Sequence, residues 1–196
     1  MRQYAQATTR NRDPILAVLA RIVPAGARVL EIASGTGEHA VYFGARLPAV
    51  SFQPSDPSPE ARASIEAWRS GAANVAAPIA LDAVARPWDV EGPFDAIVCI
   101  NMIHIAPWAA CEALLGEAPL HLRPRGVLLL YGPFMRGGVH TAESNESFDR
   151  SLRARNPSWG VRDLDVVVAL AEKRGFRLDE VVEMPANNLT VVLRLS

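Results

Sequence analysis

The chain has 196 residues, 49% of them hydrophobic and 21% charged, which suits one globular domain over residues 1–196 and excludes disorder over most of its length. The formal net charge of -1 gives no broad positive field for nucleic acid, and no apolar run reaches the roughly 18 residues that a membrane span needs. No apolar segment follows the N-terminal arginines to make a signal peptide, so we expect a cytoplasmic protein.

Stretches with strand and helix patterns alternate along the chain. A first helix is predicted to start at Asp13 and Pro14, because proline is favoured at the first helical position. Seven strands are predicted, at 28–33, 50–54, 75–81, 94–101, 126–131, 176–184 and 189–195. The other predicted helices are 38–47, 59–70, 108–118, 144–156 and 161–174.

This alternation predicts a parallel sheet covered on both faces, and right-handed crossovers make it doubly wound. The last two predicted strands are joined by residues 185–188 only, which leaves no room for a crossover helix and predicts an antiparallel hairpin. The expected fold is therefore α/β: a Rossmann-like, mostly parallel seven-stranded sheet with helices on both faces and a C-terminal antiparallel hairpin.

The first predicted strand leads into a glycine turn, with E-I-A-S-G-T-G at 31–37. Glycines allow a tight turn and a close approach to a ligand, and the next helix directs its N-terminal amides to the same place. The pattern Gly35-x-Gly37-x-x-Ala40 also fits dinucleotide binding, so the turn alone does not separate S-adenosylmethionine (SAM) from NAD, or either from a turn without ligand. Candidate cofactor contacts in the turn are Glu31, Ala33, Ser34, Gly35, Thr36 and Gly37.

Acidic residues near this turn are further candidates. Asp56, after the second strand, can accept hydrogen bonds from ribose hydroxyls or cap the next helix. The third strand ends at Leu81, and Asp82 follows it, either as a contact for adenine or as an exposed turn residue. Glu31 lies inside an apolar strand, so it needs a donor or cation, such as a methionine amino group or an N-terminal arginine like Arg12.

The run V-L-E-I-A-S-G-T-G-E-H-A from Val29 resembles motif I of class I SAM-dependent methyltransferases. Other runs resemble one small family of bacteria and animals, long known only as a domain of unknown function. They are F-Q-P-S-D from Phe52, N-M-I-H-I-A-P-W from Asn101, L-Y-G-P-F from Leu130, E-S-N-E-S-F-D from Glu143 and M-P-A-N-N-L from Met184. The resemblance, from about Arg10 to the end, implies a class I methyltransferase fold and SAM as methyl donor, with S-adenosylhomocysteine (SAH) as product. It also implies that the N-terminal segment helps to close the cofactor site.

Ligands of open parallel sheets lie beyond the carboxyl ends of the strands, so the residues after the fourth and fifth strands are candidates for the reacting site. Asn101 and Met102 are predicted to contact the methionine end of the cofactor. His104 is a candidate general base, since its ordinary pKa is near neutrality, or else a structural or substrate-positioning residue. Tyr131 either orients the acceptor or packs in the core. Further candidate substrate contacts are Trp108, Phe134, Asn145, Trp159, Asn187 and Asn188.

Methyl transfer from SAM can proceed without specialised catalytic side chains. Alignment of acceptor and methyl group can supply about 7–11 kcal/mol, so catalysis mainly by proximity and orientation is expected. The spacing of the histidines and of the two cysteines predicts no metal. Gly137-Gly138 predicts a mobile loop over the site. We expect an unidentified small-molecule acceptor; the alternatives are a non-catalytic SAM-binding sensor or scaffold, and an NAD(P)-dependent oxidoreductase.

Overall fold

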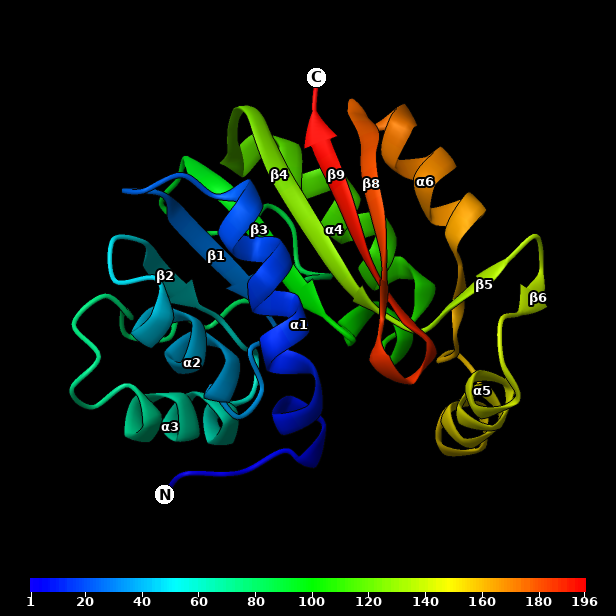
Figure 1. Cartoon of the computed structure of the whole chain (residues 1–196), viewed down its shortest axis with the longest axis horizontal. Helices are drawn as coiled ribbons and strands as arrows, with labels where there is room; N and C mark the ends of the chain where they lie inside the picture. Colours follow the sequence, from blue (N-terminus) through cyan, green and yellow to red (C-terminus); the bar gives the residue numbers. More distant parts are fainter.

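A computed structural model describes all 196 residues and has a six-stranded sheet at its centre, in the order β2-β1-β3-β4-β9-β8 (Figure 1). The first four of these strands are parallel, and β9 runs antiparallel to both β4 and β8. The expected α/β sheet with a C-terminal antiparallel hairpin is therefore confirmed. The strands are β1 (Arg28–Ile32), β2 (Ser51–Pro54), β3 (Phe94–Ile100), β4 (Leu122–Gly132), β8 (Phe176–Met184) and β9 (Asn188–Leu195).

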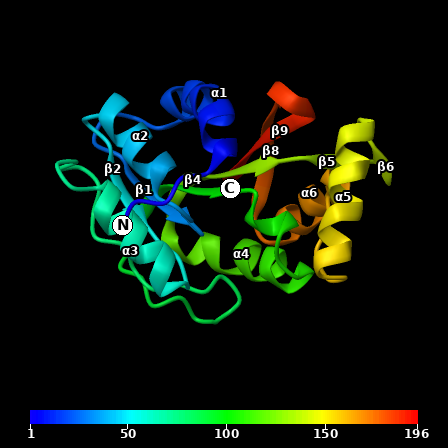
Figure 2. The same ribbon diagram turned by 90° about the horizontal axis from the view of Figure 1, so that it is seen from below.

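Helices cover both faces of the sheet. On one face lie α1 (Gln6–Ile22) and α2 (Glu38–Arg46), and on the other α4 (Trp108–His121) and α6 (Leu164–Lys173) (Figure 2). Side chains of a strand point alternately to its two faces. Leu30 of β1 packs in the core under α4 and α6, so its neighbours in the strand point towards α1 and α2.

The remaining helices lie at the ends of the sheet. α3 (Pro59–Trp68) lies beside α2, and α5 (Glu143–Arg155) lies near the opposite edge, below β5 in Figure 1. Two short 3-10 helices, η1 (Met102–His104) and η2 (Pro185–Asn187), follow β3 and join β8 to β9. None of the helices has the length and apolar character needed to cross a membrane.

The order of the strands fixes the position of the crevice. After β1 the chain moves outward to β2 and then returns to place β3 on the other side of β1. Such a reversal opens a crevice at the carboxyl ends of the two strands between which it occurs. The turn after β1 and the residues after β3 therefore face the same space, as the sequence predicted.

The predicted strand at 75–81 was wrong. This segment makes only two isolated parallel bridges to β2 and the residue that follows it. Pro54 and Pro78 have no amide hydrogen to donate, which interrupts the ladder on both sides. The carbonyl of Ala77 instead accepts a hydrogen bond from the side chain of Gln53, at 2.7 Å. The sheet consequently has six strands rather than seven, with this segment lying beside β2.

The predicted start of the first helix was also wrong. α1 begins at Gln6, and Pro14 lies inside it. A proline inside a helix removes one backbone hydrogen bond, a loss that other contacts can offset. Here the turns before Pro14 bury Thr8 and Asn11, so tertiary contacts hold this part of the chain helical.

A second, three-stranded sheet was not predicted. It contains β5 (Phe134–Arg136), β6 (Val139–His140) and β7 (Arg162–Asp163). Gly137 and Gly138 join β5 to β6 with φ angles of 56° and 77°, the positive values that a two-residue hairpin turn of this kind requires. In place of the predicted mobile loop, the structure has a hairpin, and its turn is held to the start of α6 by side-chain carboxylates.

Candidate functional site

The glycine turn after β1 is tight on one side and open on the other. An added Cβ at Gly37 would lie 2.8 Å from the Cα atom of Ile65 in α3, so only glycine lets α2 and α3 approach this closely. An added Cβ at Gly35 would meet nothing within 4 Å. The turn is thus open to a ligand at Gly35, beside the N-terminal end of α2.

Asp56 lies against the open side of this turn. Its side chain is buried and accepts hydrogen bonds from the amides of Gly35 and Ser58, each at 2.9 Å. The cap of α3 is Ser58 itself, whose hydroxyl accepts a hydrogen bond from the amide of Ala61 at 3.1 Å. Asp56 therefore holds the turn rather than capping the helix, and its carboxylate lies within reach of a ligand at Gly35.

Leu81 and Asp82 differ in their surroundings. Leu81 is buried and packs in the core on the α4–α6 side. Asp82 is exposed, and its carboxylate accepts a hydrogen bond from the amide of Val84 at 3.0 Å. Asp82 thus has the conformation of a turn residue, with its carboxylate open to solvent.

Glu31 is a buried acid without a full set of partners. It is 3% exposed, and its Oε2 atom has no hydrogen-bond partner in the protein. Burial raises the pKa of Glu31 to about 7; the charge of Asp56 adds to this shift, and a hydrogen bond from Ser34 opposes it. Such a carboxyl group is suited to accept a hydrogen bond from a cationic group of a ligand, which would favour its ionised form.

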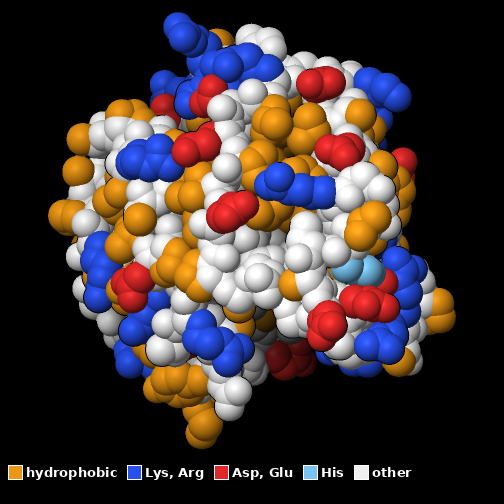
Figure 3. Space-filling model, turned by 45° about the vertical axis from the view of Figure 1, so that its right-hand side comes forward, with side chains coloured by type: hydrophobic (Ala, Val, Ile, Leu, Met, Phe, Trp, Pro, Cys, Tyr) orange, Lys and Arg blue, Asp and Glu red, His pale blue; other side chains and the backbone are white.

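A cavity of about 560 Å³ opens beyond the carboxyl ends of β3 and β4. Figure 3 shows the surface hollowed on this side of the molecule. Four predicted site residues, Asn101, Tyr131, Asn145 and Asn188, come together in its wall from separate elements. The other lining residues are Ala7, Arg10, Asn11, Ile105, Pro133, Ser144, Phe148, Pro185 and Ala186.

Tyr131 lies beside a hydrogen bond that joins α1 to α2. The Nε2 atom of His39 lies 2.9 Å from Oδ1 of Asn11, and because this oxygen only accepts, His39 is the donor. Burial, assisted by the charge of Arg12, lowers the pKa of His39 to about 4, so the ring is neutral at neutral pH. Burial raises the pKa of Tyr131, and the nearby side chain of Asn11 opposes this rise. No local pattern in the sequence indicated the roles of Asn11 and His39.

His104 lies behind the cavity rather than in its lining. The side chain is fully buried; its Nδ1 atom accepts a hydrogen bond from the amide of Arg162 at 3.2 Å, and Nε2 has no partner. The ring meets that of Phe134 edge-on, with 4.9 Å between ring centroids. An added Cβ at Gly132 would lie 2.5 Å from the His104 ring. Burial lowers the pKa of His104 to about 3, so the ring is neutral under ordinary conditions.

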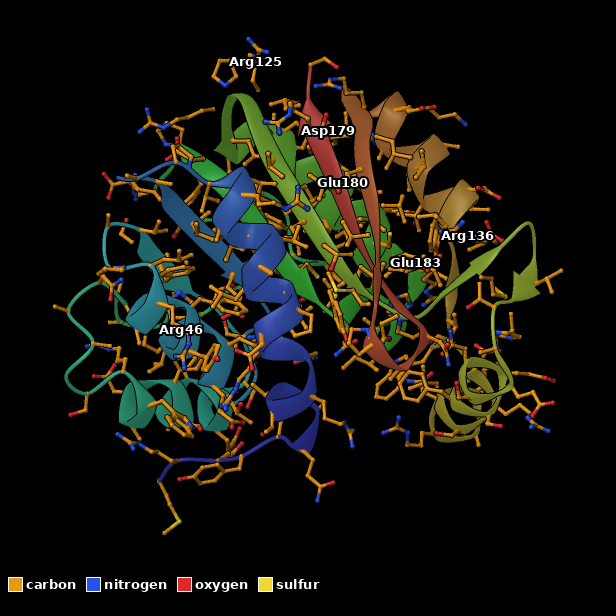
Figure 4. The ribbon with its side chains drawn as sticks, in the orientation of Figure 1. Arg46, Arg125, Arg136, Asp179, Glu180 and Glu183 are labelled. Atoms are coloured by element: carbon orange, nitrogen blue, oxygen red, sulfur yellow. The ribbon has the colours of Figure 1, made fainter.

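The asparagines of α5 and η2 tie these two elements together. Asn145 donates one side-chain hydrogen to the hydroxyl of Thr141, at 3.0 Å, and the other to the carbonyl of Asn187, at 2.8 Å. Asn188 donates to the carbonyls at positions 185 and 186. Asn187 donates to the hydroxyl of Ser144 and lines a smaller cavity of about 180 Å³, to which Arg136 and Glu183, labelled in Figure 4, also belong.

Besides His104, Asn187 and the residues in and around the glycine turn, five more predicted contacts lie outside the lining of the larger cavity. Phe134 and Met102 are buried in the core. Trp108 and Trp159 are half-buried, with the guanidinium groups of Arg162 and Arg155 over their rings. Arg12 places its guanidinium 4.3 Å from the centroid of the Tyr42 ring.

Sequence reasoning missed the contribution of α1 to the cavity wall, namely Ala7, Arg10 and Asn11. The available signal was the run R-N-R-D-P-I, which begins at Arg10 and resembles the start of the family. It was missed as a source of cavity residues because the helix was expected to begin only at Asp13. Phe148 of α5, which is 37% exposed, also lines this cavity.

The N-terminal segment crosses close to the glycine turn. The amide of Gln3 donates to the hydroxyl of Ser64 at 2.8 Å, and this hydroxyl donates to the carbonyl of Thr36, also at 2.8 Å. The amide of Ala5 donates to Glu38 at 2.6 Å. Residues 3–5 are thus attached to the turn and to the start of α2, which makes the N-terminal segment part of the wall around the turn.

Comparison with known proteins identifies one matching family and a common fold. The sequence model of a family described as "Protein of unknown function (DUF938)" matches residues 2–195. The structure of human N-acetylserotonin methyltransferase in complex with SAM superposes with a TM-score of 0.81, at 14% identity, over 97% of this chain and 53% of that one. The mitomycin 7-O-methyltransferase MmcR superposes with a TM-score of 0.78, at 16% identity, over 92% of this chain and 53% of that one.

A third match is CalO1, a methyltransferase in calicheamicin biosynthesis, in its SAH-bound form. Its TM-score is 0.75, at 18% identity, over 94% of this chain and 54% of that one. The chain thus spans about half the length of the solved structures that it matches. Similarity at such identities shows a shared fold, so the chain has the Rossmann-like fold of these methyltransferases.

Proposed function

The chain belongs to the family described as "Protein of unknown function (DUF938)", and from that premise and the geometry of its site we propose that it is a SAM-dependent methyltransferase acting on a small molecule. The observation that carries the proposal is the unpartnered, buried carboxyl oxygen of Glu31 beside the open turn at Gly35. The ammonium group of a methionine moiety would supply the donor that this oxygen lacks. The SAM- and SAH-bound structures of the same fold support this choice of cofactor.

The residues around the turn fit an adenosyl cofactor. Asp56 would accept hydrogen bonds from the ribose, and the amides of the glycine turn would face the cofactor's carboxylate. Asn101, with its left-handed φ of 63° at the end of β3, would border the methionine end and the cavity at once. Leu81 would form an apolar wall for the adenine, with Asp82 near its amino group. Ala33, Ser34, Thr36, Gly37 and Met102 complete the proposed cofactor contacts.

When bound, SAM supplies a methyl group on a positively charged sulfur, which a nucleophilic atom of the acceptor displaces in line. The cavity residues would orient that acceptor and keep water away. Tyr131 would position the acceptor through its hydroxyl, which lines the cavity next to Asn11. His104 would act as a positioning residue, since its ring packs against Gly132 directly after Tyr131.

The proposal is tested by methyl transfer itself. The protein is incubated with methyl-labelled SAM and a protein-free small-molecule extract of bacterial cells, and label in newly formed compounds is counted. We expect labelled product with the wild type and much less with Asp56→Ala. A protein that binds SAM but labels no compound would instead be a SAM-binding sensor or scaffold.

A further inference from the structure

The only charged group of the larger cavity lies on its α1 side. This group is Arg10, which is exposed and makes no hydrogen bond or ion pair within the chain. Tyr131 also lines the cavity, and its hydroxyl makes no hydrogen bond within the chain, which leaves the hydroxyl hydrogen free for a ligand. A guanidinium and a phenol hydroxyl therefore face the cavity, and both suit an anionic oxygen.

Two asparagines in the wall of the cavity, Asn145 and Asn188, present acceptors to it. Both side-chain hydrogens of Asn145 are used, one by Thr141 and one by Asn187. Both side-chain hydrogens of Asn188 are used by backbone carbonyls of η2. Each of these two asparagines consequently has only its amide oxygen left to offer, and an amide oxygen accepts hydrogen bonds but donates none.

The cavity wall thus offers one cationic group and two amide oxygens, together with an apolar part made by Ile105, Pro133, Phe148 and Pro185. Glu143 and Glu146, in the first turn of α5, are exposed and do not line it, so no carboxylate competes with a ligand for Arg10. Its volume of about 560 Å³ is in the range usual for small-molecule sites, roughly 300–1,000 Å³.

We infer that the methyl acceptor is a small carboxylic acid that also carries a hydroxyl or amino hydrogen-bond donor. Its carboxylate pairs with Arg10 and Tyr131, its apolar body lies against Phe148 and Pro133, and its donor group faces the oxygens of Asn145 and Asn188. This inference rests on the proposed function, because it takes the cavity to be the acceptor site of that reaction.

The test uses matched sets of small probes. Each set contains an aromatic or aliphatic hydroxy acid, its primary amide, which lacks the charge, and the acid without its hydroxyl. Affinities are measured by ligand-observed NMR, with the free protein and with protein saturated with SAH. The variant is Arg10→Gln, and the control is Arg150→Gln, an equal loss of charge on α5 outside the cavity lining.

We expect the hydroxy acids to bind the wild type and the Arg150→Gln control about tenfold more tightly than their amides, the scale of one charge-assisted hydrogen-bonded pair. They should also bind more tightly than the acids without the hydroxyl. In Arg10→Gln the preference for acid over amide should disappear. Equal affinity for acids and amides, no binding of any acid, or an unchanged preference in Arg10→Gln would overturn the inference. Failure of SAH to bind would count against the proposed function instead, while the acid preference is still measured on the free protein.

Discussion

At the scale of single residues, the account depends on polar side chains whose surroundings are set by distant parts of the chain. Glu31 was expected to need a partner because it lies in an apolar strand, and its buried, unpaired oxygen agrees with that reasoning. Asn11 and His39 were not expected, because their contact joins α1 to α2 and no local pattern reveals it. Residue type thus singled out this buried acid, but not the contact between Asn11 and His39.

The raised pKa of Glu31 makes a prediction about stability and pH. The pKa is about 7 in the folded protein against 4.5 as the ordinary value, so between these values the folded state holds a proton that the unfolded state has lost. Stability due to Glu31 is therefore full below pH 4.5 and falls as the pH rises towards 7, by an amount on the order of 3 kcal/mol. Glu31→Gln should remove this fall, as thermal melts of both proteins from pH 4.5 to 8 would show. The same difference in Tm between the two proteins at every pH would contradict the raised pKa of Glu31.

Tyr131 allows a separate test of the proposed chemistry. Once an acceptor is known, Tyr131→Phe should reduce kcat/KM by roughly tenfold to a hundredfold, since one positioning hydrogen bond is lost. SAH affinity should stay unchanged, because the hydroxyl faces the acceptor and not the cofactor. Steady-state kinetics and calorimetry check the two parts, and a loss of SAH affinity would place Tyr131 in the cofactor site.

At the scale of elements, the glycine turn shows how one segment can combine close packing with an open ligand site. Gly37 and Gly35 both have positive φ, but only Gly37 has another chain segment against it. Sequence reasoning identified the turn, since glycine spacing is local. It placed the start of α1 incorrectly because the helix before Pro14 is held by tertiary contacts, and it overestimated the strand at 75–81 because two prolines interrupt its pairing.

The two glycines therefore provide a matched pair of variants. Gly35→Ala should lower the free energy of unfolding by about 1–2 kcal/mol, the strain of a left-handed residue. Gly37→Ala adds a clash with the backbone of Ile65, so this variant should lose clearly more free energy of unfolding than Gly35→Ala. Urea denaturation measures both losses. Equal losses would mean that α3 shifts away at little cost.

At the scale of the whole molecule, the strand order brings the glycine turn and the larger cavity to one edge of the sheet. Alternating patterns and the short last connection were enough to predict the parallel sheet and its terminal hairpin. The small sheet of β5, β6 and β7 escaped prediction because its strands are very short and β7 joins from a distant part of the sequence. The position of α5, which lies between β6 and β7 in the chain and contributes to the cavity wall, was therefore not predicted either. Long-range packing of this kind leaves no periodic signal in the sequence.

Calorimetric titration of the purified protein with SAM and SAH, with NADH and NADPH as controls, decides whether the glycine turn binds an adenosyl cofactor. We expect micromolar binding of both adenosyl compounds, no binding of either dinucleotide, and weaker SAM binding in Asp56→Ala by a few kcal/mol at most. Binding of NADH or NADPH without binding of SAM or SAH would contradict this expectation and make the glycine turn a dehydrogenase motif.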